Sequence, residues 1–145
     1  MIFEFPEDEV HFQTYLCDEG EALDKYESLF DFRTPREKRL EFNSRRNILL
    51  ASLREKYNDQ CQLHFEGICD KQSGWVVDHL IPLSSNILNK RIRNMPAAAG
   101  KKVLTQSFGS NHINNLILSC ARCNNHKKHR FLPREHIKRI LQNSA

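Results

Sequence analysis

The pattern of apolar and polar residues begins with an acidic segment that is expected to be helical. In residues 1–31 a short extended start is predicted to lead into a helix, because Leu23, Tyr26 and Phe30 recur at helical spacing with acidic residues between them. We interpret this segment as an N-terminal arm whose amphipathic helix packs on the rest of the protein.

Residues 32–60 are predicted to form one long basic helix. Its start is marked by Thr34-Pro35-Arg36-Glu37, in which Thr would cap the helix, Pro would take the first position and Glu the third. The helix is expected to run to about Asn58. Its apolar stripe consists of Phe42, Leu49, Leu53 and Tyr57. Its other face carries Arg36, Lys38, Arg39, Arg45, Arg46, Arg54 and Lys56, and either a solvated face or a nucleic-acid contact would account for these bases.

The remaining pattern predicts two strands followed by helices. Residues 74–80 and 113–119 are rich in strand-forming side chains. They flank an insertion at about 84–112, which is helical in its first half and loop-like in its second. The polar stretch 120–130 is predicted to be helical, and Pro133 is expected to open a last short helix.

Composition and charge narrow the class of protein. The 145 residues are 39% hydrophobic and 28% charged, which allows a packed core and argues against wholesale disorder. Residues 1–31 hold ten acids and one base, a net −9, whereas residues 32–145 hold 21 bases and eight acids, a net +13. The basic part is typical of a protein that binds a polyanion, most commonly nucleic acid.

No part of the chain predicts a membrane location. No apolar run approaches the roughly 20 residues that a membrane helix needs. The first residues are acidic, whereas a secretory signal begins with basic and then apolar residues. We therefore expect an intracellular, cytoplasmic protein without a membrane partner, in which cysteines are metal ligands or free thiols rather than disulfides.

Four of the five cysteines are candidate zinc ligands. They are Cys61, Cys69, Cys120 and Cys123. Cys120-x-x-Cys123 has ligand spacing, and a closed four-thiolate site would be structural because no position stays open for substrate. His64 competes for one place, since Cys61-x-x-His64 is also ligand spacing. Cys17 is interpreted as a small buried apolar residue.

A second set of polar residues suits hydrolytic chemistry. Asp78-His79 ends the first predicted strand, Asn115-Leu116 lies in the second, and Asn124 follows the cysteine pair. Carboxylate and amide oxygens are ligands for Mg²⁺ or Mn²⁺, and histidine is a general base at neutral pH. The start of the helix at 120–130 would add backbone donors toward a phosphate.

The ordered set Asp78-His79, Asn115-Leu116 and Cys120-x-x-Cys123-Asn124-x-x-Lys127, preceded by Cys61 and Cys69, resembles the HNH endonuclease family. The resemblance covers residues 61–130. It implies an α+β fold with a small ββα-metal, treble-clef-like core stapled by zinc, with flanking helices, in which residues 61–145 form the nuclease core.

The resemblance also implies a role for each motif residue. His79 would be the general base that activates water, and Asp78 and Asn124 would hold a catalytic Mg²⁺ or Mn²⁺. Asn115 would brace the loop and orient the base. The four cysteines, with Cys69 rather than His64, would hold the structural Zn²⁺. The reaction implied is hydrolysis of DNA to 5′-phosphate and 3′-hydroxyl ends, in restriction, anti-phage defence or a mobile element. The last motif position is often His in the family and is Asn124 here, and the insertion is unusually long.

Basic residues outside the motif are candidate nucleic-acid contacts. In the insertion these are Lys90, Arg91, Arg93, Lys101 and Lys102, with a solvated lid as the alternative. In the helix after Asn124, Lys127, Lys128, His126 and His129 are expected either to face phosphates or to be solvated.

Two alternatives remain open at this point. One is a zinc-containing nucleic-acid-binding module without catalysis, and the other is a nuclease subunit that acts on RNA or depends on a partner chain. The acidic arm either packs on the body and neutralises part of its charge, or masks the DNA-binding face or docks on a protein partner.

Overall fold

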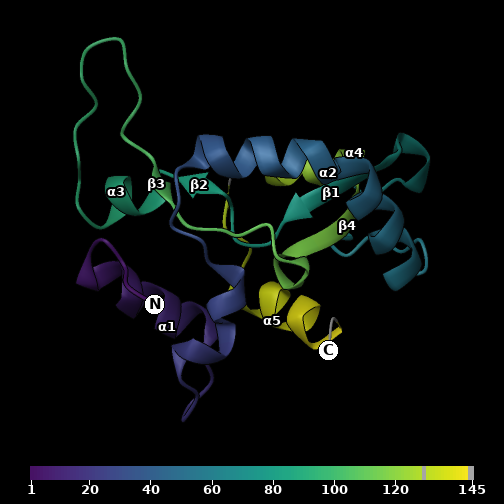
Figure 1. Cartoon of the computed structure of the whole chain (residues 1–145), viewed down its shortest axis with the longest axis horizontal. Helices are drawn as coiled ribbons and strands as arrows, with labels where there is room; N and C mark the ends of the chain where they lie inside the picture. Colours follow the sequence, from purple (N-terminus) through teal and green to yellow (C-terminus); the bar gives the residue numbers. More distant parts are fainter. Residues whose placement is uncertain (129, 144–145) are drawn as a thin grey trace.

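The computed structural model describes residues 1–128 and 130–143 and has a mixed α+β fold (Figure 1). The α-helices are α1 (Pro6–Leu16), α2 (Pro35–Lys56), α3 (Ile87–Arg91), α4 (Ala121–Lys127) and α5 (Arg134–Asn143). The strands are β1 (Trp75–His79), β2 (Ser84–Ser85), β3 (Gln106–Ser107) and β4 (Leu116–Cys120). Short 3-10 helices are η1 (Leu23–Leu29), η2 (Lys71–Ser73) and η3 (Ile113–Asn115). Within the described ranges no helix is both long and apolar enough to cross a membrane.

The two predicted strands form the central pair. β1 and β4 are antiparallel, with Asp78 opposite Ile117 and His79 opposite Leu116, and α4 follows β4 directly. β4 begins three residues later than the pattern predicted. The reason is local, because the side chain of His112 accepts a hydrogen bond from the Asn114 amide and caps η3.

The long basic helix begins as its capping sequence predicts. The Thr34 hydroxyl accepts a hydrogen bond from the Glu37 amide at 3.4 Å, and Pro35 occupies the first position of α2. α2 ends at Lys56, two residues before the expected end. The predicted apolar stripe is buried, and α2 lies against β1 and β4, so this helix covers one face of the central strand pair.

The N-terminal segment contains two helices where the sequence predicted an extended start and one helix. α1 begins at Pro6, and the three acids in its first turn stabilise the helix because they lie at the positive end of its dipole. The stretch around Leu23 and Tyr26 forms η1. Phe12 and Leu16 of α1 are fully buried in the common core, so the acidic arm is an integral part of the fold.

The acids of this arm pair with bases of the insertion and of α5. Arg93 contacts Asp8 at 2.8 Å, and Asp8 also accepts a hydrogen bond from Gln106 at 2.7 Å. Asp18 contacts both Arg134, at 2.9 Å, and Lys138, at 3.2 Å. These pairs agree with the interpretation in which the arm packs on the body and neutralises part of its charge.

The insertion forms α3 and a long loop between β2 and β3. β2 and β3 pair with each other and close its base, with Ser84 opposite Ser107. The loop between α3 and β3 extends away from the body (Figure 1), and it carries the exposed Lys101 and Lys102. The helical first half was predicted to span about ten residues, but α3 covers only Ile87–Arg91.

Lys38 joins three segments of the chain from inside the protein. We expected it on the charged face of α2, yet its side chain is 0% exposed. Its ammonium donates to the carbonyls of Asp31 at 2.7 Å, Leu83 at 2.9 Å and Gly109 at 2.6 Å. Gly109 has no room for a side chain here, because an added Cβ would lie 1.9 Å from the Ile81 carbonyl oxygen.

The burial of Lys38 generates a prediction about stability and pH. Burial lowers the pKa of Lys38 to about 8, whereas the nearby Asp31 raises it. The unfolded chain, with an ordinary lysine, therefore binds more protons between about pH 8 and pH 10.5, so this group makes the protein more stable as pH rises through that window. From pH 7.5 to 10.5 the free energy of unfolding of the wild type should rise by about 3 kcal/mol relative to Lys38→Met.

Denaturant titrations at several pH values measure this difference. Lys102→Met, which replaces an exposed lysine, is the control and should differ from the wild type by a small amount that does not change across the window. A difference between wild type and Lys38→Met that is flat with pH would show that burial does not lower the pKa of Lys38.

Candidate functional site

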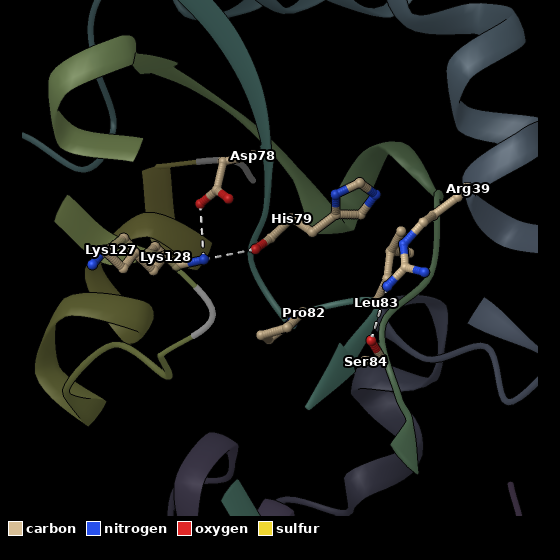
Figure 2. A pocket seen from close by; sticks show the side chains of 8 residues that line it. All are labelled: Arg39, Asp78, His79, Pro82, Leu83, Ser84, Lys127 and Lys128. Carbon is tan, nitrogen blue, oxygen red and sulfur yellow. Dashed lines mark hydrogen bonds and ion pairs between the residues drawn. The ribbon is translucent and has the colours of Figure 1, made fainter. Parts of the chain in front are cut away.

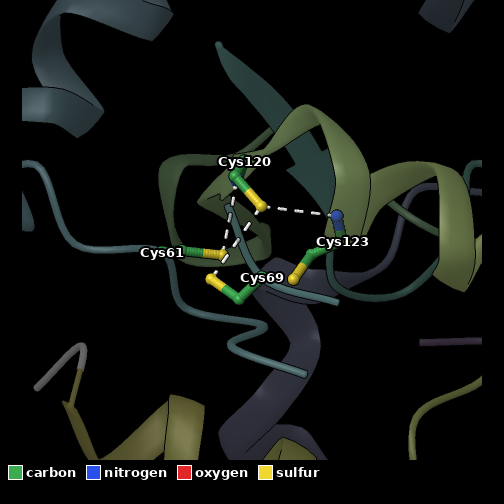
Figure 3. A group of neighbouring side chains, drawn as sticks. All are labelled: Cys61, Cys69, Cys120 and Cys123. Atoms are coloured by element: carbon green, nitrogen blue, oxygen red, sulfur yellow. Dashed lines mark hydrogen bonds between the residues drawn. The ribbon is translucent and has the colours of Figure 1, made fainter. Parts of the chain in front are cut away.

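Four cysteines gather at the junction of β4, α4 and the segment before β1. The Sγ atoms of Cys61, Cys69, Cys120 and Cys123 all lie within 4.8 Å of one another and point toward a common centre (Figure 3). A tetrahedral zinc with Zn–S bonds of about 2.3 Å would place its sulfurs about 3.8 Å apart. Cys69 and Cys120 are already 3.9 Å apart, so the cluster is consistent with a structural zinc site.

Backbone amides surround these sulfurs. The amides of Phe65 and Asp70 donate to Cys123 and Cys120, each at 3.4 Å, and the Cys120 amide donates to Cys61 at 3.3 Å. Donors of this kind stabilise thiolates rather than thiols.

The thiols differ in how readily they ionise without a cation. Burial raises the pKa of Cys69 to about 11 and also raises that of Cys123. Burial opposes ionisation of Cys120 as well, but the amides of Asp70 and Cys123 lower its pKa to about 6. Four adjacent thiolates need a cation between them, and zinc would supply it.

The two competing residues lie outside the cluster. His64 is exposed and is not part of the cluster that the four cysteines form, which favours Cys69 as the fourth ligand. Cys17 directly follows α1 and is buried in the hydrophobic core, as expected for a small apolar side chain.

Asp78 and His79 line one cavity of about 180 Å³ (Figure 2). They come from the end of β1. The opposite walls are contributed by Arg39 of α2 and by Lys127 and Lys128 at the end of α4. In Figure 2 the Asp78 carboxylate points toward the Lys127 amine, while the His79 ring points toward Arg39.

The His79 ring is fixed by two neighbours. Its Nε2 lies 2.8 Å from Oδ1 of Asn111, and its ring packs edge-on against Phe42 with centroids 4.7 Å apart. Asn111 Nδ2 donates to the Lys38 carbonyl at 2.8 Å, so its oxygen faces the histidine. Nε2 therefore carries the proton, and Nδ1 of neutral His79 keeps the lone pair that a general base needs.

The electrostatic surroundings keep His79 neutral. Burial lowers its pKa below the usual histidine range, while the hydrogen bond to Asn111 and the charge of Asp78 act in the opposite direction. Lys127 and Lys38 add to the lowering. The imidazole is thus mostly unprotonated at neutral pH, which suits a group that accepts a proton.

Asp78 is 8% exposed, and its carboxylate forms an ion pair with Lys127. Lys127 Nζ lies 2.9 Å from Asp78 Oδ2 and donates to the His79 carbonyl at 2.9 Å. Oδ2 nevertheless has no well-directed hydrogen bond from the described residues. Lys127 is 2% exposed, so it is not a solvated surface lysine, and its contact with a phosphate stays a prediction.

The two motif asparagines lie in different settings. Asn115 is fully buried; it accepts from the Ile81 amide at 2.8 Å and donates to the carbonyls of Ile81 and Ser110. It thus braces the loop beyond His79, whereas Asn111 is the residue that contacts the ring. Asn124 is half-buried in α4 and is not among the described residues that line the cavity.

The predicted nucleic-acid contacts are divided between two places. Lys128 is exposed and lines the cavity, and His126 is exposed on α4. Lys101 and Lys102 lie on the extended loop and do not line the cavity. His129 lies outside the described residues.

Sequence reasoning missed Arg39, Asn111 and the buried state of Lys127. Arg39 was one of seven bases on α2, and only the packing of α2 on β1 singles it out. The Ser-Asn-His run that contains Asn111 carries no spacing that would indicate a contact with His79.

The chain matches no known protein-family model, no curated protein and no solved structure.

We predict one tightly bound zinc per chain. Cys123→Ala removes one ligand and should lose the metal together with most of the cooperative unfolding transition, because metal binding and folding are coupled in such sites. Metal analysis by mass spectrometry and thermal unfolding monitored by circular dichroism measure the two effects.

Cys17→Ala and His64→Asn are the matched controls, since each removes a candidate ligand type outside the cluster. Asn tolerates the positive φ of 44° at position 64. Both controls should keep one zinc per chain. A well-folded wild-type protein that contains no zinc would contradict the assignment.

Proposed function

We propose that the protein is a metal-dependent nuclease of the HNH type that hydrolyses phosphodiester bonds in DNA. The observation that carries the proposal is the cavity in which a neutral, oriented His79 and the Asp78 carboxylate are surrounded by Arg39, Lys127 and Lys128. A base, a carboxylate and several cations around one small cavity suit attack on a phosphate.

The arrangement of elements supports the same proposal. The antiparallel strands β1 and β4 followed by α4, with the cysteine cluster at their junction, have the order that a ββα-metal, treble-clef-like core requires. Of the motif residues, Asp78 and His79 end β1, Asn115 precedes β4, and Asn124 lies within α4.

In the proposed reaction His79 removes a proton from water. Nδ1 takes the proton while the water oxygen bonds to phosphorus, and the bond between phosphorus and the 3′-oxygen breaks. The leaving 3′-oxygen takes a proton from solvent, which yields 5′-phosphate and 3′-hydroxyl ends. Asn111 and Phe42 hold the ring in place, and Arg39 and Lys128 attract the phosphodiester into the cavity.

A divalent cation, Mg²⁺ or Mn²⁺, would neutralise charge on the phosphate and the leaving oxygen. Asp78 fits this role, since its buried Oδ2 accepts no well-directed hydrogen bond from the described residues, although the Lys127 ammonium lies 2.9 Å away. Asn124 is the proposed second ligand from α4. The Lys127 ammonium beside Asp78 would have to share or give up its contact when the cation binds.

The charge distribution supports a polyanionic substrate. One cation of the insertion, Arg93, and two of α5, Arg134 and Lys138, are paired with acids of the arm. At the cavity, Arg39 and Lys128 form no ion pair with an acid of the described part of the chain, whereas Lys127 is paired with Asp78. Cations that remain free at a cavity are available to phosphates.

One observation favours a second candidate, a zinc-containing nucleic-acid-binding module without catalysis. The Lys127 ammonium lies on the carboxylate oxygen that a divalent cation would use, and Asn124 does not line the cavity. Such a module would bind nucleic acid with the same basic surface and would yield no product.

Cleavage of plasmid DNA, of single-stranded DNA and of an RNA of matched length separates these candidates. With added Mg²⁺ or Mn²⁺ the wild type should cleave DNA, and His79→Ala should be slower by about 10²- to 10⁴-fold, because it removes the general base. Omitting the divalent cation should abolish cleavage while the zinc stays bound, which avoids the unfolding that a strong chelator would cause.

The exposed histidine variant His64→Asn is the control and should cleave at the wild-type rate. Binding of DNA without cleavage under every divalent metal would reject the nuclease and favour the binding module. Cleavage of RNA alone would move the substrate to RNA. The setting in restriction, anti-phage defence or a mobile element stays a prediction from the resemblance.

A further inference from the structure

A second cavity, separate from the one at Asp78 and His79, lies where α4 ends and the chain turns toward α5. Its volume is about 300 Å³. Two half-buried aromatic rings line it, those of Phe65 and Phe131, together with the bases His126, Lys127 and Arg130. No acid of the described residues lines this cavity.

Both aromatic rings stand on rigid supports. The Phe65 amide donates to the sulfur of Cys123, and its carbonyl accepts from the Cys69 amide at 2.9 Å, so the cysteine cluster fixes its backbone. The ring of Phe131 packs against Phe12 and Tyr15 of α1, with centroids 5.8 Å away in each case. Rings held in this way need little ordering when a planar ligand stacks on them.

The cavity adjoins the proposed catalytic one. Lys127 lines both cavities, and its ammonium lies 2.9 Å from the Asp78 carboxylate. A nucleic-acid strand whose phosphate lies at His79 therefore has the aromatic cavity next to it, at the position of a neighbouring nucleotide.

We propose that this cavity binds an unstacked nucleobase of a single-stranded nucleic acid, next to the phosphate that is cleaved. This inference rests on the proposed function and specifies its substrate as single-stranded or locally unpaired. Aromatic side chains flanked by basic residues are the combination that binds single strands. Every nucleotide has a base whose face can stack on a ring and a phosphate whose charge a basic residue can neutralise. In a duplex the bases are already stacked and would not enter.

The chain offers matched variants for a test. Phe131→Leu and Phe65→Leu keep an apolar side chain and remove the ring. Phe32→Leu is the control, because Phe32 is a partly exposed aromatic residue that packs on Phe3 and lines a different cavity. Zinc content and thermal unfolding of each variant establish that it is folded.

Binding is measured with zinc-loaded full-length protein that carries His79→Ala, without added Mg²⁺ or Mn²⁺, so that no cleavage is needed. The probes are short DNA and RNA oligonucleotides that contain one 2-aminopurine, each as a single strand and as a duplex. Stacking quenches 2-aminopurine, and we expect quenching with single strands. Phe131→Leu and Phe65→Leu should each weaken single-strand binding about tenfold, and Phe32→Leu should not.

The outcomes distinguish the base site from the nuclease. Duplex affinity should change by less than twofold in both ring variants. No quenching in the protein with both phenylalanines would overturn the proposal whether or not a variant folds. Equal losses for single strand and duplex in a folded variant would also overturn it. Base binding in a protein that cleaves no nucleic acid would support the base site and reject the nuclease. Quenching with DNA alone or with RNA alone would identify which nucleic acid the site binds.

Discussion

The convergence of four cysteine sulfurs on one point is the constraint on which the rest of the structure depends. It closes the chain from Cys61 to Cys120 and fixes the segment before β1 to the start of α4. Because β1 ends in Asp78-His79 and α4 ends in Lys127, both walls of the cavity are positioned by this junction. A small protein obtains such rigidity from a metal more readily than from its core alone.

A second internal contact completes the cavity from the other side. Lys38 binds carbonyls of the arm, of the loop after β1 and of the loop before β4, and its own carbonyl holds Asn111 against His79. The acidic arm and the basic remainder of the sequence are also joined by ion pairs in the structure. Asp8 and Asp18 of the arm pair with Arg93 and Arg134, whereas Arg39 and Lys128 beside the cavity form no ion pair with an acid in the described part of the chain.

Local sequence signals predicted much of the architecture. The capping sequence at Thr34, the two strands and the Cys120-x-x-Cys123 pair each depend on neighbouring residues, and the structure contains each of them. Lys38, Asn111 and Lys127 acquire their roles from segments far away in the chain, and no local spacing encodes such contacts. α1 was missed although Pro6 and the acids after it are an ordinary helix start, because its apolar residues show no clear helical stripe.

The central claim is that a water molecule attacks a phosphodiester in this cavity and displaces its 3′-oxygen. The most direct test is cleavage of DNA in water enriched in ¹⁸O, under single-turnover conditions with a divalent cation, followed by mass spectrometry of the products. The account predicts one ¹⁸O atom in each new 5′-phosphate and none in the 3′-hydroxyl. A labelled 3′-phosphate, an unlabelled 5′-phosphate or the absence of any product would contradict it.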